Sequence, residues 1–133
     1  MRLLRLCLPL FLSVAAVPVF ATDYAAIEDK CREAAPQQLD NSVVMGCADE
    51  ASAAAKKDMN RVYQQTYKLL QAQGDEHAEG FEKAQKAWLQ YREAWCDSQG
   101  FSIGTPNYSL CRMQQNTARV AELNDFYRQV QPN

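Results

Sequence analysis

The sequence predicts an all-α fold: a small antiparallel bundle of three longer helices, with a short N-terminal helix attached and two disulfides stapling one end. Three observations lead to this prediction. Apolar side chains recur at steps of three and four residues along three long stretches, as on one face of an α-helix. No stretch shows the alternation of apolar and polar residues that marks a strand. Four cysteines follow the N-terminal apolar run, an even number that suits two disulfides.

The first 21 residues have the features of a secretory signal peptide. A short basic start with Arg2 and Arg5 precedes an apolar run, and Val19-Phe20-Ala21 places small residues where signal peptidase cleaves. The run is shorter than the ~20 residues of a spanning helix and contains prolines, so we expect cleavage and no integral membrane association afterwards. Residues 22–133 are then a single helical domain of a periplasmic or secreted protein.

The charge of the chain narrows the classes of partner. The full sequence carries a net charge of −2 at pH 7, and removal of the two signal-peptide arginines makes the mature protein more negative. A mildly acidic surface argues against nucleic acid and anionic membranes as partners, and it suits a basic protein.

The first two helices are predicted from their caps and their spacing. The first covers 23–35 and ends before Pro36, because a proline disfavours helical geometry in the preceding residue. After a linker over 36–41, Asn41 or Ser42 caps the second helix, which continues to about Ala72. The spacing predicts a core-facing stripe whose side chains are small in the first half of the helix. Its members are Val44, Ala48, Ala51, Ala55, Met59, Val62, Thr66 and Leu69.

The third and fourth helices complete the bundle. The third begins at about Asp75 or Gly80, ends at Ser98, and is expected to face the core with an aromatic stripe formed by Phe81, Ala84, Trp88, Tyr91 and Trp95. Gly100, Gly104 and Pro106 are then expected to break the chain. The fourth helix runs from about Tyr108 to Val130.

The cysteines converge at one end of this bundle, where the second and fourth helices begin and the third ends. Four cysteines allow three connectivities. We predict Cys31–Cys47 and Cys96–Cys111, because each pair closes a short local loop, worth ~3 kcal/mol in the entropic account.

The sequence offers little for catalysis, metal binding or a cofactor. The cysteines are committed to disulfides and the single histidine, His77, lies far from them, so we expect no nucleophile with its base and no zinc site. No glycine-rich phosphate loop is present either. Three carboxylate pairs remain, and they are expected on solvated helix faces, so we expect no enzyme: Asp49 with Glu50, Glu76 with Glu79, and Glu93 with Asp97.

The predicted loop from Asp97 to Leu110 is the best candidate for a partner-binding surface. It carries Phe101, Ile103 and Tyr108 among glycines, and a Cys96–Cys111 disulfide would hold its base, so its apolar groups could bind a partner at little entropic cost. Alternatively, the aromatic side chains fold back over the bundle end. A second candidate is the acidic connection over 74–80 at the opposite end.

A set of residues spread over nearly all of 22–133 forms a recognisable pattern. Its most specific part is Gln85-x-x-Trp88-x-x-Tyr91-Arg92-x-x-x-Cys96, and the other members are Cys31, Cys47, Asn60, Tyr63, Cys111, Thr117, Arg119 and Leu123. Together they resemble the LprI-like family of small exported bacterial proteins, named for a lysozyme inhibitor. The chain departs from that pattern at Asn116, where a threonine is expected, and it lacks the lipobox of the lipoprotein namesake.

The resemblance implies a protein that binds and inhibits lysozyme in the cell envelope, by stoichiometric association with a basic enzyme. The motif residues look like scaffold, and Arg92, if buried, needs a carboxylate or carbonyl acceptor. Function can differ between proteins that share a scaffold. The alternative is therefore a periplasmic adaptor or immunity-type protein that binds another envelope partner, and an enzyme is the third hypothesis.

Overall fold

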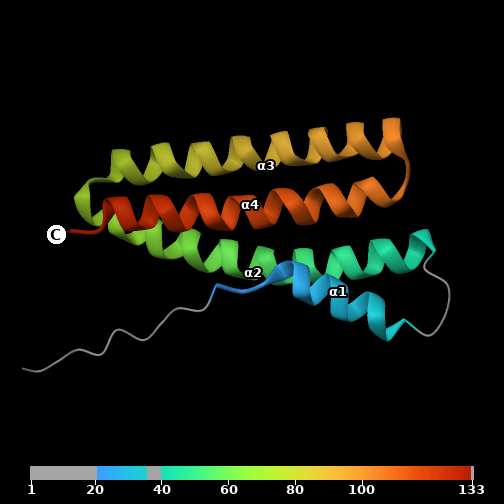
Figure 1. Cartoon of the computed structure of the whole chain (residues 1–133). Helices are drawn as coiled ribbons and strands as arrows, with labels where there is room; N and C mark the ends of the chain where they lie inside the picture. The colour runs from blue at the N-terminus through green and yellow to red at the C-terminus, as the bar shows by residue number, and fades with distance from the viewer. Residues whose placement is uncertain (1–20, 36–39, 133) are drawn as a thin grey trace, which may run out of the picture.

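The structure is a computed structural model that describes residues 21–35 and 40–132. Over these ranges the chain forms four α-helices and no strand: α1 (Tyr24–Ala34), α2 (Asn41–Gln73), α3 (Asp75–Ile103) and α4 (Pro106–Val130). The three long helices run alternately up and down, and α4 lies between α3 and α2 in Figure 1. The predicted all-α bundle is confirmed. Residues 1–20 of the predicted signal peptide and 36–39 of the linker lie outside the described residues.

Aspartates cap the first two helices. The side chain of Asp23 accepts a hydrogen bond from the backbone N–H of Ala26 at 3.0 Å, and that of Asp40 accepts one from Val43 at 3.0 Å. These contacts satisfy backbone donors that have no partner within the helix. The cap of α2 is therefore Asp40, and neither of the predicted caps, Asn41 or Ser42.

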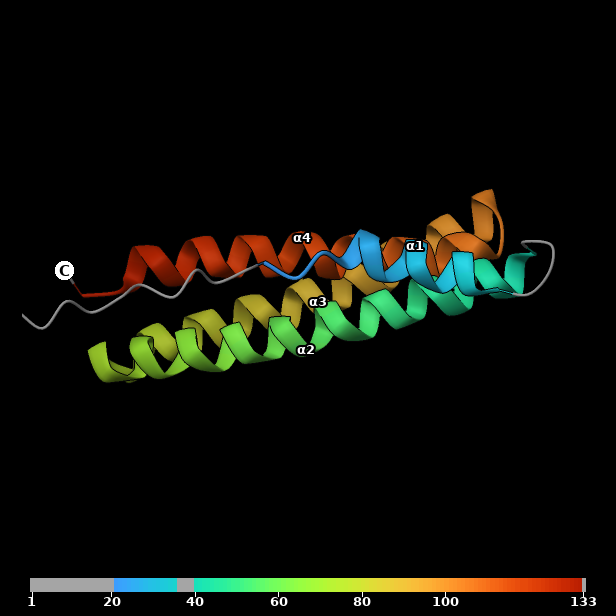
Figure 2. The same ribbon diagram turned by 60° about the horizontal axis from the view of Figure 1, so that its bottom comes forward.

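The short helix α1 packs against α2, over which it lies in Figure 1, and in Figure 2 the end of α1 lies next to the start of α2. Tyr24 fastens it: the ring is buried, and the hydroxyl donates to Asp58 of α2 at 2.7 Å. Burial, followed by the hydrogen bond and the negative charge of Asp58, raises the pKa of Tyr24 to about 12.

The connections between the long helices are shorter than predicted. Gly74, at φ 155°, separates α2 from α3, so the acidic stretch from Asp75 onward is helical and is not a loop. At the other end, α3 does not stop at Ser98 but continues through Gly100 to Ile103. The chain turns at Gly104, at φ 134°, and α4 begins two residues later at Pro106, a residue suited to the first helical turn.

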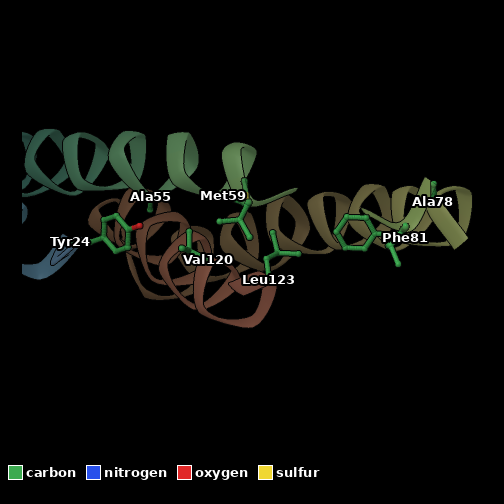
Figure 3. Packing of buried hydrophobic residues seen from close by; sticks show 9 residues of the cluster. Tyr24, Ala55, Met59, Ala78, Phe81, Val120 and Leu123 are labelled. Carbon is green, nitrogen blue, oxygen red and sulfur yellow. The ribbon is translucent and has the colours of Figure 1, made fainter. Parts of the chain in front are cut away.

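The interior of α2 is built from small side chains. Ala48, Ala51 and Ala55 are fully buried, and Met59 and Val62 continue the same stripe, so the predicted core face is confirmed for most of its length. Because alanines allow close approach, α4 packs against α2 more extensively than α3 does. Figure 3 shows Met59 beside Val120 and Leu123 of α4. Leu70, not Leu69, closes the stripe.

Both predicted disulfides are present. Cys31 is bonded to Cys47, with Cα atoms 5.4 Å apart, and Cys96 is bonded to Cys111, with Cα atoms 5.3 Å apart. The first ties α1 to α2, and the second ties α3 to α4. Both lie toward the end of the bundle where α2 and α4 begin.

Candidate functional site

The inward face of α3 differs from the predicted aromatic stripe. Tyr91 and Trp95 are 54% and 44% exposed, and their rings stack on each other with centroids 6.4 Å apart. The buried residues lie on a neighbouring face of the helix and include polar ones: Ala78, Phe81, Gln85, Arg92, Cys96 and Gly100. The prediction that both tryptophans face the core is therefore wrong for Trp95, and Trp88 is half-buried.

A polar network makes this burial possible. Arg92 donates to Asn116 of α4 at 2.7 Å, and Asn116 donates to Ser52 of α2 at 2.9 Å, so one chain of hydrogen bonds joins all three long helices. Arg92 also donates to Glu93 at 2.9 Å. The buried guanidinium thus has the acceptors that its burial requires. Asn116, which departs from the expected threonine, is the residue that connects the other two helices.

Glu93 accepts hydrogen bonds from two arginines at the edge of this network. It accepts from Arg92 and, at 2.8 Å, from Arg112, which also donates to Asp97 at 2.7 Å. Burial alone would raise the pKa of the Glu93 carboxyl, but the hydrogen bonds and charges of the two arginines outweigh it and hold that pKa below its usual value. Arg112 therefore pairs with both carboxylates of the predicted pair, Glu93 and Asp97.

Two cations lie over the ring of Trp88. The guanidinium carbons of Arg92 and Arg119 lie 5.4 Å and 5.2 Å from its ring centroid, within the range of cation–π attraction. Arg119 in turn donates to Gln85 at 3.0 Å and to Glu122 at 2.6 Å. Gln85, Trp88, Arg92 and Arg119 of the predicted signature therefore form one structural cluster between α3 and α4.

The remaining signature residues lie apart from this cluster. Tyr63 of α2 stacks on Phe81 of α3, with ring centroids 5.1 Å apart. Asn60 is exposed on α2, and Tyr91 is exposed on α3.

The predicted binding loop is a helical tip, which we define as residues 98–110 and call the α3–α4 tip. Phe101 and Ile103 are 87% and 68% exposed on the last turn of α3. Tyr108 folds back onto α3. Its ring occupies the space that a side chain on Gly100 would fill, 2.4 Å from the position of an added Cβ. No charged residue occurs in the tip, and the Cys96–Cys111 disulfide holds its base. The tip is thus an uncharged helical projection on which two large apolar side chains, Phe101 and Ile103, are exposed.

A groove of about 650 Å³ opens between α3 and α4 toward the other end of the bundle. Phe81, Leu123 and Phe126 contribute apolar surface to it, and Glu76, Glu122 and Asp125 contribute carboxylates. We call it the α3–α4 groove. The sequence singled out only the acidic stretch 74–80, since the α4 residues that complete the groove lie far away in the chain.

The chemistry available elsewhere is limited. Asp49, Glu50, Glu76 and Glu79 are exposed on their helices. Within the described part of the chain no three potential ligands are grouped so as to hold a metal ion. No helix in that part is both long and apolar enough to cross a membrane.

The comparison with known proteins points to one family. The family model described as lysozyme inhibitor LprI matches residues 31–123. A protein of Rhizobium meliloti (strain 1021) described as uncharacterized is 32% identical, over 74% of this chain and 79% of the relative. No solved structure matches the chain. The matched segment contains both disulfides, the polar network and the α3–α4 tip.

Proposed function

This chain belongs to the LprI family of lysozyme inhibitors, and from that premise we propose that it binds lysozyme and inhibits it by stoichiometric association. Family membership carries the proposal. The net negative charge supports it, because a basic lysozyme and an acidic inhibitor attract each other and associate faster.

We place the protein in the periplasm or outside the cell, after cleavage near Ala21. Two disulfides and the family both point to an extracytoplasmic protein, because cytosolic thiols are kept reduced. The basic and apolar start of the sequence supports export by a signal peptide.

We propose the α3–α4 tip as the surface that contacts the enzyme. A lysozyme holds its polysaccharide between two carboxyl groups. An uncharged projection brings no like charge next to such carboxyl groups, and Phe101 and Ile103 supply apolar surface to be covered. Because the tip is helical and bound to its base by a disulfide, little conformational entropy is lost on binding.

A cell-wall lysis assay tests the function. Purified mature protein, mixed with a basic c-type lysozyme, should reduce lysis in a saturable manner, with a stoichiometric end point and weaker inhibition at high salt. Undiminished lysis at a large molar excess of the protein would contradict the proposal.

Substitutions at the tip test the surface. Phe101→Ser combined with Ile103→Ser should weaken inhibition without lowering the free energy of unfolding, because both side chains are exposed. Tyr91→Ser is the matched control, since it removes an exposed apolar group from the side of α3. Equal inhibition by the tip variant and the wild type would exclude the tip and leave inhibition itself intact.

A further inference from the structure

The floor of the α3–α4 groove is aromatic and partly open. The Phe81 ring stacks on Tyr63 and lies 5.6 Å from the ring of Phe126, which is 37% exposed. In Figure 3 the ring of Phe81 points toward Leu123. On the α3 wall, a Cβ added to Gly80 would meet nothing within 4 Å. The groove therefore has room above an apolar floor for a large side chain.

Carboxylates surround this floor on both walls. Glu76 on α3 and Glu122 and Asp125 on α4 line the groove, against one guanidinium, that of Arg119. Asp75 and Glu79 are also exposed on the first two turns of α3, but they do not line the groove. Two of the lining carboxylates have arginine partners, since Glu122 accepts from Arg119 and Asp125 from Arg128. Three carboxylates therefore stand against two guanidinium groups, and the net negative charge of one comes from Glu76.

We infer that the α3–α4 groove is a second docking site, which takes a cationic segment of a partner protein that carries a large apolar side chain. The apolar side chain covers the rings of Phe81 and Phe126, and lysines or arginines on either side of it face the carboxylates of the two walls. Charge complementarity of this kind favours a basic partner and rejects an acidic one.

The groove is separate from the tip proposed for lysozyme. Gly80 in the groove and Phe101 at the tip lie on the same helix, so at ~1.5 Å per residue they are about 30 Å apart. Asp125 and Phe126 also lie beyond residue 123, where the family match ends. The inference rests on the proposal that the tip contacts lysozyme, which leaves the groove free for another partner.

Binding of a defined probe tests the inference. The probe is a fluorescent amphipathic peptide made only of leucine and lysine, and its control is the same peptide with glutamate in place of every lysine. The lysine peptide should bind the wild-type protein, and the glutamate peptide should not. Removal of two groove charges by Glu76→Gln with Asp125→Asn should weaken binding by about three- to tenfold, the effect of two partly exposed ion pairs.

A charge-matched variant separates the groove from the overall charge of the protein. Asp29→Asn with Asp49→Asn removes the same charge from exposed positions on α1 and α2, and binding should stay within about twofold of wild type. Equal weakening by the two double variants would overturn the inference, since attraction to the net charge would then explain the binding.

Gly80→Arg supplies a second and independent variant. It places bulk and positive charge in the open part of the groove, where an added Cβ meets no atom within 4 Å, so the fold should persist while peptide binding is lost. Unchanged binding to Gly80→Arg would contradict the groove site. If Gly80→Arg abolishes lysozyme inhibition, the groove is the lysozyme site and the assignment of a second partner is wrong. A wild-type protein that binds the peptide but inhibits no lysozyme would refute the proposed function alone.

Discussion

Two glycines on α3 give a test of how the tip is held in place. Gly80 and Gly100 are both helical, and alanine is favoured over glycine in a helix interior by about 1 kcal/mol. At Gly80 the added Cβ meets nothing within 4 Å, so Gly80→Ala should raise the free energy of unfolding by about 1 kcal/mol.

Gly100→Ala should behave in the opposite way. Its Cβ would lie 2.4 Å from Cγ, Cδ1 and Cδ2 of Tyr108. Rotation of the ring about χ2 leaves Cγ in place, so relief requires a change of rotamer or a shift of the first turn of α4. Overpacking of this kind costs about 1–3 kcal/mol, which cancels or exceeds the gain in helix propensity. The free energy of unfolding of Gly100→Ala should therefore fall below that of Gly80→Ala by about 1–3 kcal/mol.

Urea unfolding followed by far-ultraviolet circular dichroism, with the disulfides intact, measures this difference. A double-mutant cycle supplies the control: with Tyr108→Ala already in place, Gly100→Ala should regain the stabilisation seen at Gly80. If Gly100→Ala and Gly80→Ala stabilise the otherwise unchanged protein equally, Tyr108 does not pack on Gly100 and our account of the end of α3 is wrong.

Three other predictions concern the interior, the N-terminal helix and the tip. Asn116→Ala leaves the buried guanidinium of Arg92 one acceptor short and should lower the free energy of unfolding by about 1–3 kcal/mol in urea titrations; a loss near zero would contradict the network. The folded-state pKa of Tyr24, about 12, lies above its ordinary value of 10.0, so stability should fall as pH rises from about 10 to 12. Tyr24→Phe should reduce that slope in urea titrations across this range, and an unchanged slope would count against the raised pKa. Replacing both Cys96 and Cys111 by serine should lower the free energy of unfolding by ~3 kcal/mol in the entropic account. In the lysis assay it should also reduce lysozyme inhibition more than the same change at Cys31 and Cys47 does. Equal losses of inhibition in the two variants would show that the tip is not needed for inhibition.

The features that the sequence predicts well are those with local causes. The core stripe of α2 follows from alanines at helical spacing, and each disulfide joins cysteines 15 or 16 residues apart, so neither depends on distant parts of the chain. The all-α fold follows from the same spacing. The features predicted wrongly depend on contacts across the bundle. Taken alone, Gly100 predicts a break in the helix. In the structure it is a helical residue without a side chain, and the ring of Tyr108 from the next helix fills the space that a side chain would occupy.

The groove was only partly predictable for a similar reason. The acidic stretch after Gly74 is visible in the sequence, and it reads as a loop because glycines lie at both of its ends. Only Gly74 adopts a positive φ, whereas Gly80 is an ordinary helical residue. The opposite wall, with Asp125 and Phe126, comes from α4, and no local pattern connects it to α3.

The rotational position of α3 explains why two large aromatic rings are exposed. Neighbouring residues on an α-helix project about 100° apart, so a rotation that buries Trp95 would carry Cys96 away from Cys111 and Arg92 away from Asn116.

Burying the exposed half of one such ring would gain about 2 kcal/mol. Loss of the disulfide would lower the free energy of unfolding by ~3 kcal/mol. Each buried polar group left without a partner would lower it by about a further 1–3 kcal/mol. The two rings together offer about 4 kcal/mol, whereas loss of the disulfide and of the partners of Arg92 and Asn116 would cost about 5–9 kcal/mol. The covalent bond and the polar network, and not hydrophobicity alone, therefore select the observed position. Tyr91 and Trp95 are then exposed as a consequence of helix rotation, without any need for a ligand, and this makes Tyr91→Ser the appropriate control for the tip.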